Sequence, residues 1–277
     1  MSNEFLPLGP SGSTPPRVLT IAGSDSGGGA GLQADLRSMA MLGVHGCVAV
    51  TAVTVQNSLG VNGIHEIPDT IVAGQMTAVV TDLGIAAAKT GMLASSNIIA
   101  AVAATWRRLG LTVPLVVDPV CASMHGNPLL APSALDSLRH QLFPLATLVT
   151  PNLDEVRLLV DIDVIDSASQ RTAAEALFAL GPRWVLVKGG HLRSSSHSPD
   201  LLYDGSSCYE FDAPRVPTRH DHGAGDTLST AVACALAQGS TMLEAVAFGK
   251  RWVTACLNAA YPLGGGYGPV SPLFRLQ

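Results

Sequence analysis

The sequence is poor in charge, in aromatic side chains and in paired cysteines. Only 13% of its 277 residues are charged, about half the usual share, and 5% are aromatic. The net charge of −5 offers no basic footprint, so we expect no nucleic-acid partner. A hydrophobic content of 47% excludes a disordered chain. The core must therefore be built from Ala, Val, Leu and Ile.

The five cysteines are scattered and contain no C-x-x-C pair, which argues against disulfides and zinc and favours the cytoplasm. Residues 1–16 have neither a basic nor a long apolar segment, so we expect a disordered tail there instead of a signal peptide. Residues 38–65 carry no Asp, Glu, Lys or Arg, but they contain Gly, His, Gln and Asn. We interpret them as a buried strand with flanking loops and expect no membrane span.

Glycine is abundant, with 28 residues, and short β-rich runs alternate with helical ones. This alternation predicts right-handed βαβ crossovers and a mostly parallel sheet covered by helices on both faces. We expect one domain over residues 17–277, a hairpin over 200–211, and a ligand site at the C-terminal ends of the strands. The predicted sheet strands cover residues 18–22, 47–55, 85–90, 115–118, 148–150 and 184–188.

Two familiar phosphate-binding motifs are missing. Gly249-Lys250 lacks the P-loop's upstream glycine, and the run of glycines at 27–31 fails to complete G-x-G-x-x-G. Residues 222–227 (HGAGDT) instead open an apolar helix, where glycine N–H groups and the helix dipole favour an anion. Asp226 in the first turn is a candidate base for phosphoryl transfer. The same residues also fit a plain Gly-rich turn with an acidic residue favoured by the dipole.

Residues 20–35 form a strand, a Gly-rich loop and a helix, and they resemble the N-terminal signature of the hydroxymethylpyrimidine/phosphomethylpyrimidine kinases. The resemblance continues in the same order through nearly the whole chain, from residue 17 to about 271. It implies a three-layer α/β/α ribokinase-like fold with a mostly parallel central sheet. The further matching blocks are residues 53–57, 89–93, 117–120, 150–155, 187–191 and 222–229.

For the phosphoryl-transfer centre, the resemblance implies that Asp226 is the base. Gly223, Ala224 and Gly225 would form the anion hole. Many pyrimidine kinases of the family carry Cys at the position of Asp226, whereas sugar, adenosine and many pyridoxal kinases carry Asp. Ala224 also replaces the usual Thr or Ser. The N-terminal block therefore decides the substrate, and it favours a pyrimidine.

For the nucleotide, the resemblance implies that Asn152 and Lys188 lie near the phosphates of ATP. Asp118 and Glu155 would face Mg²⁺, directly or through water. Each residue also has a structural interpretation. Asn152 and Glu155 fit a helix capping box, Asp118 fits a strand-end turn, and Lys188 fits an ordinary exposed lysine.

For the acceptor pocket, the resemblance implies that Gly23, Asp35, Gln56 and Met92 hold the pyrimidine. An amide at Gln56 can both donate to and accept from an aminopyrimidine, and Met92 can lie against its ring. Asp35 either accepts a hydrogen bond from the substrate or secures the loop. Taken alone, Met92 also fits a core methionine and Asp35 a helix-surface aspartate.

The implied function is ATP-dependent phosphorylation of 4-amino-5-hydroxymethyl-2-methylpyrimidine, and of its monophosphate to the diphosphate, in thiamine biosynthesis. The implied partners are the pyrimidine, ATP, Mg²⁺ and a second copy of the chain in a homodimer. Two alternatives stay open. One is a pyridoxal/pyridoxine kinase of the same superfamily, and the other is a non-catalytic vitamin-binding regulator.

Overall fold

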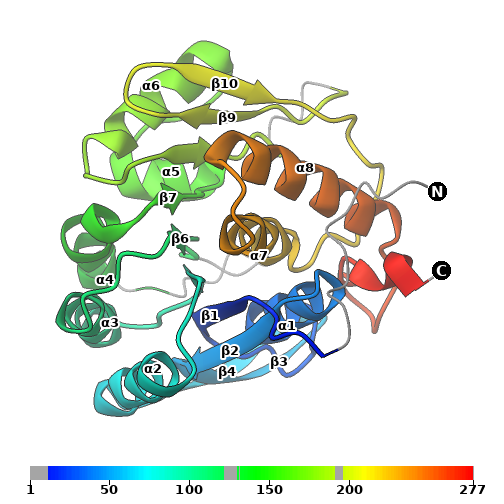
Figure 1. Ribbon diagram of the computed structural model, residues 1–277. Coiled ribbons are helices and arrows are strands. Elements are labelled where there is room, and N and C mark those ends of the chain that lie inside the picture. Colours follow the sequence, from blue (N-terminus) through cyan, green and yellow to red (C-terminus); the bar gives the residue numbers. More distant parts are fainter. Residues whose placement is uncertain (1–11, 122–129, 131, 191–195, 277) are drawn as a thin grey trace.

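The centre of the molecule is an eight-stranded sheet in the order β10-β9-β8-β7-β6-β5-β1-β2 (Figure 1). The computed structural model describes residues 12–121, 130, 132–190 and 196–276. Strands β1, β2, β5, β6, β7 and β8 are parallel, and β9 and β10 continue the sheet antiparallel. The predicted mostly parallel sheet is thus confirmed. Its strands are β1 (Arg17–Ala22), β2 (His45–Val50), β5 (Ala87–Thr90), β6 (Leu115–Val117), β7 (Leu148–Val149), β8 (Val185–Val187), β9 (Asp200–Tyr203) and β10 (Cys208–Phe211).

Helices cover both faces of this sheet, which confirms the three-layer architecture (Figure 1). One face carries α1 (Gly31–Met41), α7 (Ala224–Ala237) and α8 (Met242–Asn258). On the other face, the described residues form the π-helical turn Leu138–Leu142, the 3-10 helix Phe143–Leu145 and a set of α-helices. These helices are α2 (Asp69–Asp82), α3 (Ser96–Arg108), α4 (Pro132–Ser137), α5 (Leu153–Val160) and α6 (Ser167–Phe178).

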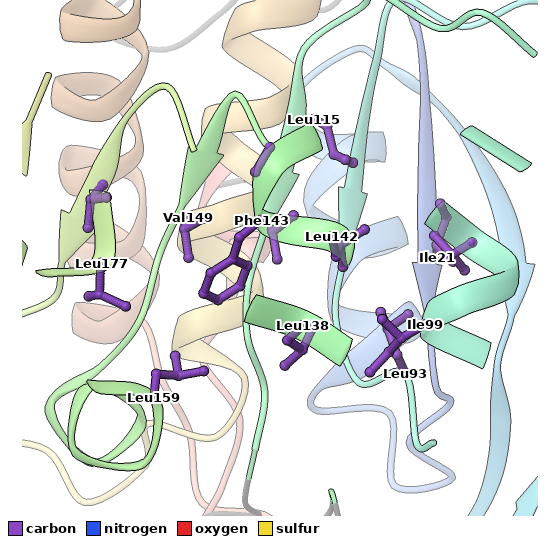
Figure 2. Close-up of a cluster of buried hydrophobic side chains, with 14 of the residues drawn as sticks. Ile21, Leu93, Ile99, Leu115, Leu138, Leu142, Phe143, Val149, Leu159 and Leu177 are labelled. Atoms are coloured by element: carbon purple, nitrogen blue, oxygen red, sulfur yellow. The ribbon is translucent and has the colours of Figure 1, made fainter. Parts of the chain in front are cut away.

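The two cores follow from the period-two alternation of strand side chains. In β1, Leu19 and Ile21 pack toward α2–α6, whereas Val18 packs toward α1, α7 and α8. Figure 2 shows part of the first core, where the ring of Phe143 lies between Val149 on one side and Leu138 and Leu142 on the other. Burying each such side chain contributes about 1.5–3 kcal/mol. The central strands of the sheet are largely hydrophobic because both faces of the sheet are covered.

The strand predicted over residues 47–55 is wrong. Strand β2 ends at Val50, and the chain enters β3 (Ala52–Asn57), which pairs with β4 (Gly60–Glu66) in a separate two-stranded sheet. This hairpin is not buried, because the side chains of Val53 and Val55 are 47% and 64% exposed. The apolar run is continuous because β2 is followed directly by β3, in which Val53 and Val55 face outward. The turn also lacks an Asn-Gly or Asp-Gly signal, so β4 was missed.

The other organisational predictions have mixed outcomes. The hairpin at 200–211 is confirmed, and Asp204 accepts hydrogen bonds from the backbone N–H groups of Ser206 and Ser207 in its turn. Most of the predicted tail, residues 1–11, lies outside the described residues. Within the described ranges, no helix has the length and apolar character needed to cross a bilayer. The single domain over 17–277 stays a prediction.

Candidate active site

The Gly-rich loop after β1 packs directly against the N-terminus of α7. Gly223, the N-cap of α7, has a φ of 79°, and a Cβ there would lie 2.0 Å from the carbonyl oxygen of Gly29. Only glycine allows both this backbone conformation and this approach. The imidazole of His222 adds a side-chain link, since its Nε2 lies 2.8 Å from Oδ2 of Asp25. The two glycine clusters therefore form one unit.

Asp25 organises the first of these loops, although the sequence analysis did not single it out. Its carboxylate accepts hydrogen bonds from the N–H groups of Gly27, Gly29 and Ala30 at 2.8–3.0 Å. Burial acts to raise the pKa of Asp25, but the contact with His222 and the backbone donors lower it overall. An Asp followed by glycine two residues later is a known turn signal, and this signal could have identified it.

Asp226 belongs to a cluster of three charged side chains, together with Lys89 and Asp35. Lys89 in β5 donates to Oδ1 of Asp226 at 2.8 Å and to both oxygens of Asp35 at 3.0 and 3.1 Å. The N–H of Gly31 donates to Oδ2 of Asp226 at 3.1 Å. The side chains of Lys89 and Asp35 are 0% exposed, whereas that of Asp226 is 14% exposed. Asp226 is therefore the member of this cluster that reaches the surface.

The two carboxylates that share Lys89 differ in their affinity for protons. Burial raises the pKa of Asp35 to about 6, although Lys89 acts against the rise. Burial also acts to raise the pKa of Asp226, but Lys89 outweighs it and the pKa stays below its usual value. Burial acts to lower the pKa of Lys89, yet the neighbouring carboxylates raise it. Asp226 and Lys89 are thus both charged at neutral pH.

The structure corrects the predicted position of Asp35. It lies on no helix surface and no open pocket wall, because the whole residue is buried. Besides Lys89, its carboxylate accepts hydrogen bonds from the hydroxyls of Thr20 at 2.5 Å and Thr230 at 2.6 Å. These donors leave no accessible oxygen for a ligand in this structure. Sequence reasoning missed Lys89. A lysine near the end of an apolar strand could have indicated it, because a charged side chain buried there needs oppositely charged partners.

In a second cluster, Asp118 follows β6 and is also buried. Its Oδ1 accepts from Nζ of Lys188 at 3.0 Å and from the hydroxyl of Thr150 at 3.2 Å. Ser229 donates to its other oxygen at 3.2 Å. Lys188 is 13% exposed, and its Nζ lies 3.9 Å from Oε2 of Glu155. The structure therefore brings together the predicted Asp118, Lys188 and Glu155.

Asn152 and Glu155 form the capping box of α5. Oδ1 of Asn152 accepts from the N–H of Glu155 at 2.9 Å, and Oε2 of Glu155 accepts from the N–H of Asn152 at 2.7 Å. This confirms the capping interpretation. Burial raises the pKa of Glu155 to about 8, with Lys188 acting to lower it and Asp118 to raise it. Contacts of these two residues with nucleotide or metal stay predictions.

The predicted anion hole needs one correction. The N–H of Ala224 donates to the carbonyl of Asp221 at 3.0 Å, so it is already engaged. The N–H groups of Gly225 and Asp226 have no acceptor among the described residues, as expected in the first turn of a helix. A Cβ on Gly225 would lie 3.4 Å from Nζ of Lys188 and 3.5 Å from Oδ2 of Asp118. Gly225 therefore lies beside Asp118 and Lys188.

Three of the four predicted pocket residues lie where β3 meets the loop after β1. A Cβ on Gly23 would come within 2.4 Å of the methyl carbon of Met92. Gln56 is paired through its backbone with Ser26, whose hydroxyl donates to the carbonyl of Gln56 at 2.6 Å and accepts from its N–H at 2.8 Å. Met92 is only partly buried, so it is not an ordinary core methionine. Contact of these residues with a substrate stays a prediction.

Comparison with known proteins identifies the family. The sequence profile of the phosphomethylpyrimidine kinases matches residues 25–271. A hydroxymethylpyrimidine/phosphomethylpyrimidine kinase of Mycobacterium tuberculosis is 77% identical over 274 residues, which is 99% of this chain and 100% of the relative. This chain belongs to the phosphomethylpyrimidine kinase family. The predicted resemblance is thereby confirmed, and the protein is a kinase.

Solved structures agree with this membership. A pyridoxal kinase of Bacillus subtilis, solved as an ADP complex, is 34% identical with a TM-score of 0.88, over 95% of this chain and 100% of its own. A phosphomethylpyrimidine kinase of Clostridium difficile is 36% identical with a TM-score of 0.77, over 86% of this chain and 98% of its own. The predicted ribokinase-like fold is confirmed.

The donor set of this kinase fits Mg²⁺ that is bound mainly by phosphates and water. Among the residues that the structure describes, no group of three or more His, Cys, Asp or Glu side chains is placed to hold a metal. Asp118 and Glu155 supply hard oxygen ligands, but the ammonium of Lys188 lies against both. Mg²⁺ commonly keeps several waters and uses only one or two carboxylates together with substrate phosphates.

Proposed function

We propose that this kinase uses ATP to phosphorylate the 5-hydroxymethyl group of 4-amino-5-hydroxymethyl-2-methylpyrimidine, and then the resulting monophosphate, in thiamine biosynthesis. The support is a relative of that named activity with 77% identity across nearly the whole chain. The structural observation that carries the proposal is a partly exposed Asp226 carboxylate beside the N–H groups of Gly225 and Asp226, which have no acceptor among the described residues. A base and an anion-binding helix terminus thus meet at one point.

In the first reaction, the substrate hydroxyl attacks the γ-phosphorus in line. The new oxygen–phosphorus bond forms as the bond to the β,γ-bridging oxygen breaks, and that electron pair leaves with ADP. The hydroxyl proton passes to the carboxylate of Asp226, whose oxygens each keep a lone pair besides those used by Lys89 and Gly31. Such transfers depend mainly on positioning and charge stabilisation, which suits a weakly basic carboxylate.

The nucleotide would be bound by the start of α7 together with Lys188, Asn152, Asp118 and Glu155. The N–H groups at the start of α7 would bind the transferring phosphoryl group, and Lys188 and Asn152 the neighbouring phosphates. Asp118 and Glu155 would hold Mg²⁺ through water. When bound, the metal neutralises negative charge on the phosphates. The ADP complex of the Bacillus subtilis relative supports a nucleotide in this fold.

At the acceptor end, Gln56 would hydrogen-bond the ring nitrogen and exocyclic amine of the pyrimidine. Its backbone is tied to Ser26, so the side-chain amide is the part left to serve a ligand. Met92 would lie against the ring, and the missing side chain of Gly23 would leave it room. Asp35 enters this proposal only through Lys89.

We further propose a cytoplasmic homodimer in which residues 17–277 form a single domain. The β3–β4 hairpin supports a dimer because Val53 and Val55, which project from the same face of β3, are 47% and 64% exposed, and Leu59 in the turn is 65% exposed. Contiguous exposed apolar side chains commonly mark protein interfaces. Light scattering coupled to size-exclusion chromatography is expected to give twice the chain mass, and a monomer would contradict the proposal.

The substrate is tested by comparing four acceptors in one coupled ATP-consumption assay. Hydroxymethylpyrimidine and its monophosphate are expected to turn over, whereas pyridoxal and ribose are not. Turnover of pyridoxal alone would contradict the proposal and favour a pyridoxal kinase. Tight binding of the pyrimidine without any turnover would favour a vitamin-binding regulator.

The role of Asp226 is tested by Asp226→Asn. Loss of the base is expected to lower kcat at least about 10²-fold, with little change in pyrimidine binding. Asp82→Asn makes the same chemical change at an exposed position at the end of α2 and serves as the matched control. Wild-type turnover by Asp226→Asn would defeat its assignment as the base.

A further inference from the structure

Lys89 uses its full set of hydrogen-bond donors inside the protein. An ammonium has three N–H groups, and Nζ of Lys89 makes three contacts of 2.8–3.1 Å, one with Asp226 and two with Asp35. The side chain has no exposed area, so water cannot replace any of these partners. A buried charge of this kind is held strongly by its partners and is costly to move.

Asp35 is in turn fixed from two sides. The hydroxyl of Thr20 in β1 donates to its Oδ2, and that of Thr230 in α7 donates to its Oδ1. Lys89 is therefore anchored to a carboxylate that is itself attached to both a strand and a helix. Gly91 leaves the space for this arrangement, since a Cβ there would lie 3.1 Å from Nζ of Lys89 and 3.6 Å from Oδ1 of Asp226.

We propose that Lys89 is a positioning residue for phosphoryl transfer, which, anchored by Asp35, holds the carboxylate of Asp226 ionised and in a fixed orientation toward the acceptor hydroxyl. This inference rests on the proposed role of Asp226 as the base. Lys89 fixes Oδ1, and the N–H of Gly31 fixes Oδ2. With both oxygens held, the plane of the carboxylate is set before any substrate arrives. Misplacing such a group by about 1 Å can cost about 10²-fold in rate.

The charges around Asp226 come from five elements of the fold. Lys89 lies on β5, Asp35 on α1, Asp118 after β6, Lys188 after β8, and His222 just before α7. Lys89 makes the shortest ion pair with it, at 2.8 Å. Without Lys89, burial would raise the pKa of Asp226, and the carboxylate would bind a proton at higher pH.

The decisive variant is the double substitution Lys89→Met/Asp35→Asn. It removes one positive and one negative charge together, so Asp226 loses its cation but no second buried carboxylate is left unpaired beside it. Circular dichroism and thermal unfolding establish that this variant is folded. We expect kcat to fall about 10²-fold, a KM for ATP within a few-fold of wild type, and an acidic limb of the kcat–pH profile shifted to higher pH. A wild-type kcat and limb would overturn the proposal.

A second readout does not depend on which acceptor the kinase uses. Carbon-13 NMR of aspartate-labelled protein, assigned with Asp226→Asn, follows the titration of the Asp226 carboxyl without substrate. The double variant is expected to titrate at higher pH than wild type. Asp35→Asn alone leaves Lys89 with Asp226 as its one ion-pair partner, so that titration is expected to move to lower pH. Unchanged titration in the double variant would overturn the proposal even if the pyrimidine proves to be the wrong substrate.

Discussion

The site contains two lysine–carboxylate clusters that have similar chemistry but differ in exposure. Lys89 lies near the end of β5 between Asp35 and Asp226, and Lys188 follows β8 between Asp118 and Glu155. Lys89 is fully buried and makes three contacts of 2.8–3.1 Å. Lys188 is 13% exposed, with one contact of 3.0 Å and a second of 3.9 Å.

This difference separates a fixed part of the site from a part that can exchange partners. All three N–H groups of Lys89 donate to carboxylates. Lys89 can therefore orient Asp35 and Asp226, but it has no donor left for a ligand. Lys188 has a longer and weaker pairing with Glu155, whose oxygen is also engaged by the N–H of Asn152. Because Lys188 reaches solvent, a phosphate can approach it without breaking a buried ion pair. We therefore expect the Lys89 cluster to be formed before any ligand binds and the Lys188 cluster to be completed by the ligand.

The largest expected effect is on the free energy of unfolding. One substitution at each lysine tests the difference between the two clusters. Lys89→Met leaves two carboxylates buried without their cation and is expected to lower the free energy of unfolding by about 3–5 kcal/mol. Lys188→Met leaves Asp118 with hydroxyl donors from Thr150 and Ser229, so its loss is expected to be about 1–3 kcal/mol. Chemical denaturation measures both values, and equal losses would contradict the distinction between the clusters.

The next effect is on nucleotide use. Lys188→Met is expected to lower kcat/KM for ATP about 10²-fold, because it removes a charged donor from the transferring phosphates. The KM for the pyrimidine is expected to stay within a few-fold of wild type. Arg171→Met, which removes an exposed cation from α6, is the matched control. A change confined to the KM for the pyrimidine would contradict the assignment of Lys188 to the nucleotide phosphates.

The two clusters also show what the sequence could predict. The alternating strands and helices predicted the layers, and the spacing of Asn152 and Glu155 predicted the capping box, because both are local patterns. The pairing of Lys89 is not local, since its partners Asp35 and Asp226 lie 54 and 137 residues away. The engaged N–H of Ala224 depends on the turn geometry at Asp221, which no residue pattern specifies.

The β3–β4 hairpin was missed for a different reason. Its first strand continues an apolar run, and the change from the buried Ala52 to the exposed Val53 leaves no mark in composition. Only the separate sheet pairing reveals it. Hydrophobicity alone therefore identifies the core strands well but cannot distinguish them from an exposed apolar strand such as β3.

The smallest expected effect is a change in how stability depends on pH. The pKa of Asp35 is raised by burial from an ordinary value of 3.8 to about 6 in the folded protein. Between these two values the folded state binds more protons than the unfolded state, so the free energy of unfolding falls as pH rises. The pKa of Asp226 is lowered despite burial, because of Lys89, so its contribution is lost only as pH falls below 3.8.

The pH ranges in which Asp35 and Asp226 affect stability do not overlap. The variant Asp35→Asn therefore isolates the contribution of Asp35 from that of Asp226. Relative to this variant, wild type is expected to lose stability as pH rises from about 4 to about 6, with no further relative change above that range. Chemical denaturation at several pH values measures the difference, with Asp82→Asn at an exposed site as control. Parallel curves for wild type and Asp35→Asn would mean that Asp35 is as easily ionised as a surface carboxylate. The burial of Asp35 would then have no measurable effect on its pKa. Only the contact distances and exposed fractions would distinguish the Lys89 cluster from the Lys188 cluster.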